Sequence, residues 1–422
     1  MNEYASTETA LLIAVEQPED SHAAVTASLD ELKQLVRTIG IAPREATIVR
    51  LARPHPRYLL GSGKTDELIE RAKEIGTGYI IFDFDLAPAQ QRNWEKSSDL
   101  CVIDRHEVIL QIFADRAFTK EANLQVALAR LQYSLPRLKR QWTHLSRQRG
   151  GAHGTRGEGE TQLEADRRVV ENRIARVKRD LVGVREQRAT MRKHRTDVPV
   201  PTGALVGYTN AGKSSLLNRL TSGQVLVADK LFATLDPTTR RLPLPNGTEA
   251  LLTDTVGFIR KLPHDLVDAF RSTLEETVLA DFLIHVVDVS SSEMEHQISV
   301  TRKVLEEIGA GEKPVIIVLN KVDLLADPPQ VFRRADAGYT VAVSAESGYG
   351  IESLLAAIQE LVASTMKAVE MVLPASRYDL AALVHRTGHV LSKDYIDGTI
   401  HMRAQVPDKT RNKLQAFLVR PG

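Results

Sequence analysis

The chain has 422 residues, of which 43% are hydrophobic and 26% are charged, and its formal net charge is +1. This composition indicates a globular protein with several cores, since a single core stops growing at about 250–300 residues. No apolar run is long enough to cross a bilayer, so we expect no membrane span. The lone cysteine, Cys101, excludes an intrachain disulfide framework and fits a reducing cytoplasm. We expect Cys101 to be a buried structural thiol in a strand.

The first 117 residues alternate apolar, strand-like runs with stretches of helical periodicity. The expected strands are 10–15, 46–51, 78–82 and 100–103, and the expected helices are 28–39, 64–75 and 87–96. This alternation predicts a parallel sheet covered by helices. Residues 60–65 (Leu-Gly-Ser-Gly-Lys-Thr) resemble a phosphate-binding loop, but Tyr58 stands where the motif needs its first glycine. We interpret them as a turn before a helix, with a phosphate or RNA contact as the alternative.

Residues 118–195 have a different pattern, which predicts a helical hairpin. Leucines, with Trp142 in one place, recur at steps of four and three from Leu124 to Leu145, and apolar residues keep nearly the same period from Leu163 to Val184. Two such stripes predict an antiparallel two-helix coiled coil. Pro136 should kink the first arm, and Thr161 with Glu164 predicts a capping box at the start of the second.

The predicted hairpin is strongly basic. Residues 120–195 carry 19 Lys and Arg against 8 Asp and Glu, a net of +11, whereas residues 1–119 have a net of −6 and residues 196–422 a net of −4. Such an asymmetry indicates either a polyanionic partner or a solvated, salt-bridged helix pair. The joining loop, residues 149–160, has five glycines. The candidate RNA contacts around this loop are Arg137, Lys139, Arg140, Arg147, Arg149 and Arg156.

Residues 207–214 read Gly-Tyr-Thr-Asn-Ala-Gly-Lys-Ser, a complete phosphate-binding loop between a predicted strand and a predicted helix. Its backbone N–H groups should surround phosphate oxygens, Lys213 should reach the β- and γ-phosphates, and Ser214 should bind Mg²⁺. The expected nucleotide contacts in this loop are Gly207, Tyr208, Thr209, Asn210, Ala211, Gly212, Lys213, Ser214 and Ser215. Asn210 could also help to seat K⁺ beside the phosphates.

Three further motifs follow in chain order, each after a predicted strand. Residues 254–257 are a D-x-x-G, in which Asp254 should hold Mg²⁺ through water and Gly257 should approach the γ-phosphate. Residues 320–323 are an N-K-x-D, whose Asp323 carboxylate accepts from two donors that guanine presents together, so GTP is favoured over ATP. Residues 344–346 should close over the base. The expected contacts in these motifs are Asp254, Thr255, Val256, Gly257, Asn320, Lys321, Asp323, Ser344, Ala345 and Glu346.

The segment before D-x-x-G should contain a threonine that binds Mg²⁺ when the γ-phosphate is present. Thr234 is the first choice and Thr238 the second, and Phe232 and Ala233 join Thr234 as expected nucleotide contacts. No catalytic residue can be assigned. Lys213, Thr234 and Gly257 should stabilise the γ-phosphate, but Phe258 stands where Ras-like enzymes place a water-orienting glutamine. Hydrolysis by the site alone should therefore be slow, with the missing groups supplied by a moving loop or by a partner.

Four stretches of the chain resemble the HflX family, ribosome-associated GTPases of the Obg–HflX branch: residues 207–215, 232–238, 254–258 and 156–168. The resemblance covers residues 1 to about 365 and implies an α/β subdomain, a helical hairpin and a Ras-like GTP-binding domain. It also implies binding to rRNA of the large ribosomal subunit, with the hairpin loop directed toward the peptidyl-transferase region, and splitting of stalled ribosomes under stress. Phe258 fits the family pattern, whereas Glu158 departs from it, because proline is expected there.

We therefore expect an α/β protein with five segments: an α/β subdomain (1–117), the hairpin (118–195), a linker (196–202), the GTP-binding domain (203–365) and a small α+β module of unknown role (366–422). The expected partner is the ribosome rather than DNA, the protein should be a monomer, and a membrane contact would be peripheral. One alternative is a GTP-dependent switch whose hairpin docks a protein. Another is an enzyme with its chemistry in residues 1–117, where no nucleophile–base pair or metal-ligand cluster is found.

Overall fold

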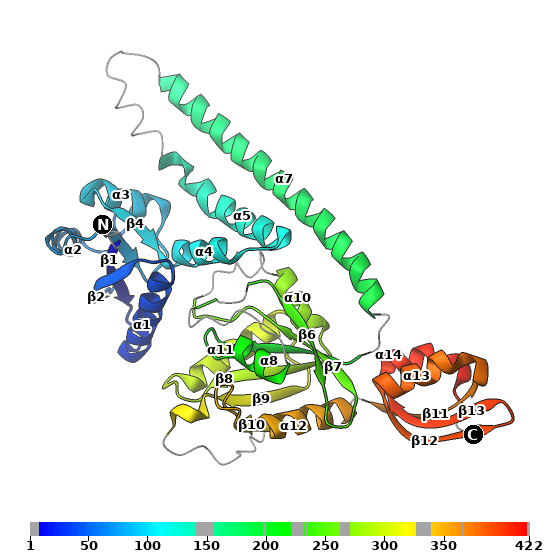
Figure 1. Cartoon of the computed structure of the whole chain (residues 1–422). Helices are drawn as coiled ribbons and strands as arrows, with labels where there is room; N and C mark the ends of the chain where they lie inside the picture. Colours follow the sequence, from blue (N-terminus) through cyan, green and yellow to red (C-terminus); the bar gives the residue numbers. More distant parts are fainter. Residues whose placement is uncertain are drawn as a thin grey trace, which may run out of the picture. The chain divides into compact units, whose positions relative to one another are not determined.

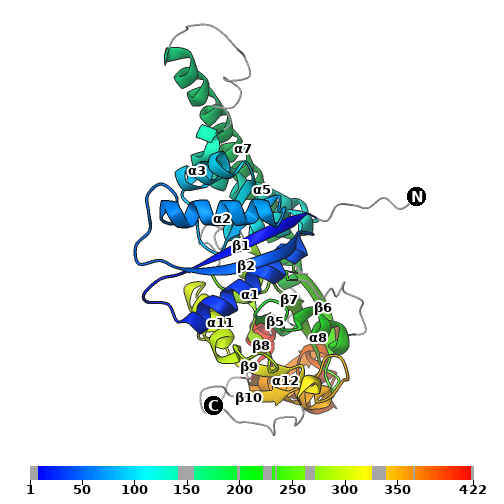
Figure 2. The same ribbon diagram turned by 90° about the vertical axis from the view of Figure 1, so that its left-hand side faces the viewer.

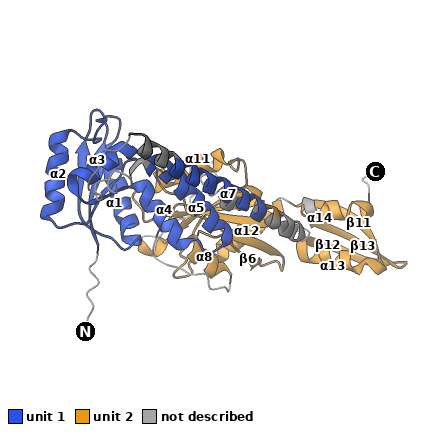
Figure 3. Cartoon of the chain, turned by 90° about the horizontal axis from the view of Figure 1, so that it is seen from above, with its two compact units in different colours: residues 1–185, 230–232, 260–270 blue, residues 186–229, 233–259, 271–422 orange. Residues whose placement is uncertain are grey.

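The computed structural model describes residues 8–140, 156–196, 200–221, 231–232, 235–261, 271–325, 339–364 and 366–419. The chain forms two compact units, which Figure 3 shows in different colours. Unit 1 consists of residues 1–185 together with two short segments, 230–232 and 260–270. Unit 2 consists of residues 186–229, 233–259 and 271–422.

Unit 1 is built on a parallel sheet in the order β2-β1-β3-β4. Its strands are β1 (Thr9–Glu16), β2 (Ala42–Arg50), β3 (Tyr79–Phe82) and β4 (Cys101–Asp104). Its first helices are α1 (His22–Thr38), α2 (Ser62–Glu74), α3 (Pro88–Ser98) and α4 (Arg105–Arg116). Figure 2 shows α1 and α2 on opposite sides of the β1–β2 pair. The predicted helix-covered parallel sheet is thus confirmed.

Two details of unit 1 bear on the sequence predictions. Cys101 is exposed at the start of β4, so the prediction of a buried thiol is wrong: the burial of β4 begins one residue later, at Val102. Residues 60–65 form a turn and the start of α2, as predicted. Neither Gly61 nor Gly63 has a positive φ or a heavy atom within 4 Å of an added Cβ, so nothing in this turn requires glycine.

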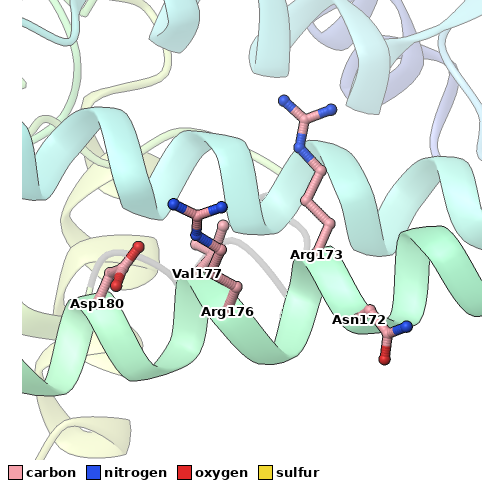
Figure 4. A pocket seen from close by; sticks show the side chains of 5 residues that line it. All are labelled: Asn172, Arg173, Arg176, Val177 and Asp180. Carbon is pink, nitrogen blue, oxygen red and sulfur yellow. The ribbon is translucent and has the colours of Figure 1, made fainter.

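The hairpin region contains α5 (Lys120–Ser134), a 3₁₀ helix (Leu135–Arg140) and α7 (Arg156–Thr196). Figures 1 and 4 show α5 and α7 side by side, and Figure 1 shows that they run in opposite directions. Pro136 does more than kink the first arm, since α5 ends before it. The predicted start of the second arm at Thr161 is wrong, because α7 begins at Arg156. An acidic residue in the first turn favours such a start, and the sequence has Glu158 there.

The first part of unit 2 is a six-stranded sheet in the order β10-β9-β8-β5-β7-β6, parallel except for β6. Its strands are β5 (Thr202–Gly207), β6 (Thr238–Pro243), β7 (Glu249–Asp254), β8 (Phe282–Asp288), β9 (Val315–Asn320) and β10 (Tyr339–Ala342). Its helices are α8 (Lys213–Leu220), α10 (Arg271–Leu279), α11 (Met294–Glu307) and α12 (Ile351–Ser364). Leu216 of α8 and Ile358 of α12 belong to the core on one face of this sheet.

The C-terminal part of unit 2 is a three-stranded antiparallel sheet in the order β11-β13-β12. It comprises β11 (Lys367–Pro374), α13 (Tyr378–Thr387), β12 (His389–Ile396), β13 (Thr399–Val406) and α14 (Asp408–Lys413). Its own core includes Met371, Val384 and Met402. The expected α+β composition is confirmed. Among the described helices, none combines the length and apolar character that a membrane span requires.

Candidate functional site: a guanine nucleotide site at the carboxyl edge of the six-stranded sheet

The phosphate-binding loop connects the end of β5 to the start of α8. Three of its residues have positive φ: Gly207 (145°), Asn210 (60°) and Gly212 (92°). A Cβ on Gly207 would lie 2.2 Å from the carbonyl oxygen of Val286, and a Cβ on Gly212 would lie 2.2 Å from Asn320 Nδ2. The loop therefore requires both glycines. Its curvature and the start of α8 form the kind of backbone concavity that binds anions.

Lys213 is held across this loop. Its Nζ donates hydrogen bonds to the carbonyl oxygens of Gly207 at 3.1 Å and Tyr208 at 2.8 Å. Burial lowers the pKa of Lys213 to about 8, and the carboxylate of Asp254 partly opposes this shift. The lysine thus lies where an incoming phosphate would meet it, and a phosphate would favour its charged form.

The end of β7 brings an acidic residue to the loop. Ser214 Oγ donates to Asp254 Oδ2 at 2.6 Å, and Thr255 Oγ1 donates to the carbonyl oxygen of Leu205 at 2.6 Å. A Cβ on Gly257 would lie 2.8 Å from Thr209 Cα and 2.9 Å from Lys213 Nζ. D-x-x-G and the phosphate-binding loop are therefore packed closely enough to require glycine at position 257.

Phe258 is tied to the phosphate-binding loop by its backbone. Its N–H donates to Gly207 O at 3.1 Å, and its carbonyl oxygen accepts from Thr209 N–H at 2.8 Å. Its side chain is 2% exposed. The ring is therefore part of the core, and Phe258 presents no side-chain group to a water molecule beside the phosphates.

The end of β9 carries the residues expected to bind guanine. Asn320 Nδ2 donates to Ala211 O at 2.8 Å, and its Oδ1 accepts from the N–H of Ala345 at 3.1 Å, so Asn320 braces the loops as predicted. Lys321 Nζ forms a 2.6 Å ion pair with Asp288 Oδ2. Asp323 is exposed. In the 344–346 loop, Ser344 is buried and its Oγ accepts from Ser347 N–H at 3.0 Å, while Glu346 is exposed.

The segment before D-x-x-G is described in part. Ala233 and Thr234 lie outside the described residues, and Thr238 is the first residue of β6, paired with Asp254. Phe232 is 2% exposed, and its ring centroid lies 4.6 Å from that of Phe113. The Phe232 side chain is therefore packed in unit 1, and a nucleotide contact of this residue would have to come from its backbone.

The basic residues expected to touch RNA lie around the ends of the hairpin arms. Arg147 and Arg149 lie outside the described residues, Lys139 and Arg140 end the 3₁₀ helix, and Arg156 begins α7. Arg137 is engaged internally: its guanidinium donates to Leu86 O at 2.9 Å and lies 3.5 Å from the centroid of the Tyr133 ring. The guanidinium group of Arg137 is therefore largely occupied within the protein and offers little to a phosphate.

A cavity of about 550 Å³ lies along α7 (Figure 4). Arg173 and Arg176 project from α7 toward the neighbouring helix in this view. The cavity is lined by Asn172, Arg173, Arg176, Val177 and Asp180. Its lining thus includes two cationic side chains of the described part of the hairpin, Arg173 and Arg176.

Two contacts of the nucleotide site were missed in the sequence. Asp288, the partner of Lys321, ends the apolar run of β8 at the same sheet edge as the motifs, and that position could have revealed it. Arg219 of α8 donates to Ser347 O at 3.1 Å and so links the helix after the phosphate-binding loop to the 344–346 loop. No pattern along the sequence indicates this second contact.

The order of the motifs at the carboxyl edge of this sheet defines a P-loop GTPase. Family models match residues 26–114 (GTP-binding GTPase N-terminal), 116–195 (GTP-binding GTPase Middle Region), 202–321 (50S ribosome-binding GTPase) and 330–419 (HflX C-terminal domain). The chain is 47% identical to GTPase HflX of Akkermansia muciniphila, over 97% of each chain. It is 43% identical to GTPase HflX of Escherichia coli, over 90% of this chain and 89% of the relative. The chain therefore belongs to the HflX family of GTPases.

Among solved structures, the chain is similar to a GTP-binding protein of Sulfolobus solfataricus in complex with GDP. The identity is 25%, the TM-score is 0.46, and the match covers 84% of this chain and 98% of that one.

Proposed function

We propose that this GTPase binds the large ribosomal subunit in its GTP form, splits or rescues stalled ribosomes under stress, and is stimulated by the ribosome to hydrolyse GTP. The observation that carries this proposal is the buried ring of Phe258 after D-x-x-G. A site that has its guanine and phosphate loops, but a buried ring in place of a water-orienting side chain directly after D-x-x-G, needs help from elsewhere for fast turnover. The match of residues 202–321 to a model described as a 50S ribosome-binding GTPase supports the ribosome as the source of that help.

The nucleotide roles follow from the contacts described above. Lys213 and the backbone of residues 207–212 would hold the phosphates, Asp323 would select guanine, and Asn320 would keep the two loops together. Mg²⁺ fits the donors present, since Ser214 Oγ and Asp254 Oδ2 are hard oxygens 2.6 Å apart beside the phosphate-binding loop. Ser214 would bind the ion directly and Asp254 through water, with Thr234 completing the set. When bound, Mg²⁺ neutralises charge on the phosphates.

K⁺ is a further proposed cofactor. Asn210 is exposed in the phosphate-binding loop and has a positive φ, so its side chain could help to seat a monovalent cation beside the phosphates. Equal GTPase rates in K⁺ and Na⁺ buffers would rule this role out.

RNA is the proposed contact of the hairpin. Residues 120–195 carry a net charge of +11, and phosphate neutralisation by Lys and Arg dominates binding to nucleic acids. The proposed contacts are Lys139, Arg140, Arg147, Arg149 and Arg156, with Arg137 contributing little. We further propose that the protein acts in the cytoplasm as a monomer.

Sedimentation with separated ribosomal subunits tests the proposal. The protein with a non-hydrolysable GTP analogue should co-migrate with the large subunit, and the protein with GDP should not. Absence of co-migration in both nucleotide states would overturn the proposal. An Asp323→Asn variant is a matched control, because it should bind the subunit only when a xanthine nucleotide replaces the guanine one.

A second candidate function is a switch whose hairpin docks a protein partner. Val169 and Val182 of α7 are 64% and 54% exposed, and apolar side chains of this kind can serve a protein interface. Binding to protein-free rRNA would favour the first candidate, and binding that requires ribosomal proteins would favour the second.

A further inference from the structure

The loop after β10, residues 344–350, is closed by hydrogen bonds within itself. The N–H of Ser344 donates to the carbonyl oxygen of Tyr349 at 3.0 Å, and the N–H of Gly348 donates to the carbonyl oxygen of Ser344 at 2.9 Å. Ser344 is buried, whereas Tyr349 is exposed. The loop therefore has a defined shape of its own, and contacts from other elements decide where this shape lies beside the sheet.

Side chains of two other elements contact this loop. At its start, the Oδ1 atom of Asn320, which ends β9, accepts from the N–H of Ala345 at 3.1 Å. Farther along, the guanidinium of Arg219 in α8 donates from Nη2 to the carbonyl oxygen of Ser347 at 3.1 Å. Asn320 belongs to the N-K-x-D motif, whereas Arg219 belongs to no nucleotide-binding motif. The second contact therefore needs an explanation of its own.

The guanidinium of Arg219 lies directly against the backbone of Gly348. A Cβ at this position would lie 2.1 Å from Arg219 Nη2 and 3.0 Å from Arg219 Cζ. Gly348 has a φ of 89°, a conformation that favours glycine. The turn therefore leaves the space of a side chain free, and the guanidinium fills it while bonding to the preceding carbonyl oxygen. Although Arg219 is exposed, its contact is fitted to the shape of this loop.

Helix α8 gives Arg219 a fixed position relative to the phosphate-binding loop. The helix begins at Lys213 and has Arg219 in its last turn. Its apolar side chains Leu216, Leu217 and Leu220 belong to the core of the GTP-binding part. Because packed core side chains allow little displacement, both ends of this short helix are fixed together. The helix therefore places one cation at the phosphates and another at the 344–350 loop.

We propose that Arg219 is a positioning residue for the guanine base: its hydrogen bond to Ser347 holds the 344–350 loop where the backbone of residues 344–346 can meet the base oxygen. The proposal rests on the proposed role of residues 344–346 at the base. Arg219 acts through the loop rather than on the nucleotide. Its loss should therefore weaken recognition of the base and leave the chemistry at the γ-phosphate unchanged.

A nucleotide altered only at the base oxygen tests this role in the full-length protein without ribosomes. 6-Thio-GTP has sulfur, a weaker acceptor, in place of this oxygen, so the parent chain should bind GTP more tightly than 6-thio-GTP. Arg219→Ala should fold normally, because the side chain is exposed. We expect it to raise the Kd of GTP and of GDP about three- to tenfold, as the loss of one charge-assisted hydrogen bond predicts. The preference for GTP over 6-thio-GTP should fall toward one, and the intrinsic kcat should not change.

Two further variants serve as controls. Arg219→Lys keeps a donor for the carbonyl oxygen of Ser347 and should restore most of the affinity and of the preference. Arg241→Ala removes another exposed arginine of the GTP-binding part, whose Nη1 lies 3.7 Å from Glu249 Oε2, and should leave both quantities unchanged.

The outcomes separate the role of Arg219 from that of the loop. An unchanged Kd in Arg219→Ala would overturn the proposal. So would a raised Kd with the parent's full preference for GTP over 6-thio-GTP, because Arg219 would then support the fold without positioning the base. A parent chain without this preference would overturn both the proposed base contact of residues 344–346 and the role of Arg219. Since no ribosome is present, these results do not depend on the proposed ribosomal function.

Discussion

Asn320 donates a hydrogen bond from Nδ2 to the carbonyl oxygen of Ala211 at 2.8 Å and so ties the base-reading loop to the phosphate-binding loop. The residues are 109 positions apart in the chain. The contact leaves room for nothing larger than glycine at position 212, where a Cβ would lie 2.2 Å from the same nitrogen.

Removing the hydrogen bonds of Asn320 between the two loops should weaken the binding of GTP and of GDP equally. Asn320→Ala deletes the donor to Ala211 and the acceptor for Ala345, so we expect the Kd values of GTP and GDP to rise about tenfold or more, at roughly 1–1.5 kcal/mol for each hydrogen bond. Isothermal titration with each nucleotide measures the change. A loss of affinity for GTP alone would contradict this role of Asn320, because its hydrogen bonds to Ala211 and Ala345 do not depend on the γ-phosphate.

Changing the carboxylate of Asp323 should alter which base is bound. An amide at this position would place a donor against the donors of guanine, so Asp323→Asn should weaken GTP binding by at least about a hundredfold. Xanthine presents an acceptor at the corresponding position, and the variant should bind its triphosphate more tightly than GTP. Competition between the two triphosphates measures the preference. Equal losses for both would mean that Asp323 supports the loop rather than reads the base.

The position of the sequence motifs at one edge of the sheet could be predicted because each motif is local and follows a strand. Gly207, Asp254 and Asn320 end strands β5, β7 and β9, and the carboxyl ends of parallel strands meet at one edge of a sheet. The sheet topology therefore places these three residues near one another, although they are far apart in the sequence. Asp288 ends β8 at the same edge and was missed because it belongs to no motif.

The Asp83–Lys261 contact could not be predicted in this way. The two residues are 178 positions apart, and neither lies in a recognisable pattern. Their pairing depends on Lys261 belonging to unit 1, with its Nζ 3.0 Å from Asp83 Oδ2, which only the tertiary structure shows. Cys101 was misjudged for a related reason: an apolar run predicts a strand, but the strand's first residue can still be exposed.

The salt dependence of ribosome binding should reveal how many hairpin cations meet RNA phosphates. Replacing Arg147, Arg149 and Arg156 with alanine should reduce the slope of log K against log salt by about 0.9 for each lost phosphate contact on duplex-like RNA. Nucleotide affinity should not change. Replacing Arg71 of α2, whose guanidinium pairs with Glu45 of β2 and with Glu74 of α2, is a control in unit 1. An unchanged slope in the triple variant would show that these arginines do not contact RNA phosphates.

The affinity for GTP should decrease in alkaline buffer because of Lys213. Burial lowers its pKa to about 8 in the nucleotide-free protein. A triphosphate favours the ammonium form, so binding above pH 8 must take up a proton, and the Kd should rise toward about tenfold per pH unit. Below pH 8 the lysine is already charged and the affinity should be nearly constant. Titrations at pH 7, 8 and 9 in buffers of different ionisation enthalpy measure the proton uptake. A pH-independent Kd across this range would contradict the shifted pKa.

His285 should make the GTP-binding part of unit 2 unstable in mild acid. It lies in β8 and is 5% exposed, and burial, with the positive charges of Lys213 and Arg302, lowers its pKa to about 3. Between pH 3 and 6.5 the unfolded chain binds a proton here that the folded protein does not, so stability falls as the pH falls through this window. Between pH 7 and pH 5, His285 should lower the free energy of unfolding by about 2 kcal/mol. His285→Gln should lose less stability over the same interval, and His385→Gln, at an exposed position on α13, should behave like the parent chain. Urea denaturation at both pH values measures the difference, and equal acid sensitivity of His285→Gln and the parent would show that His285 does not resist protonation in the folded state.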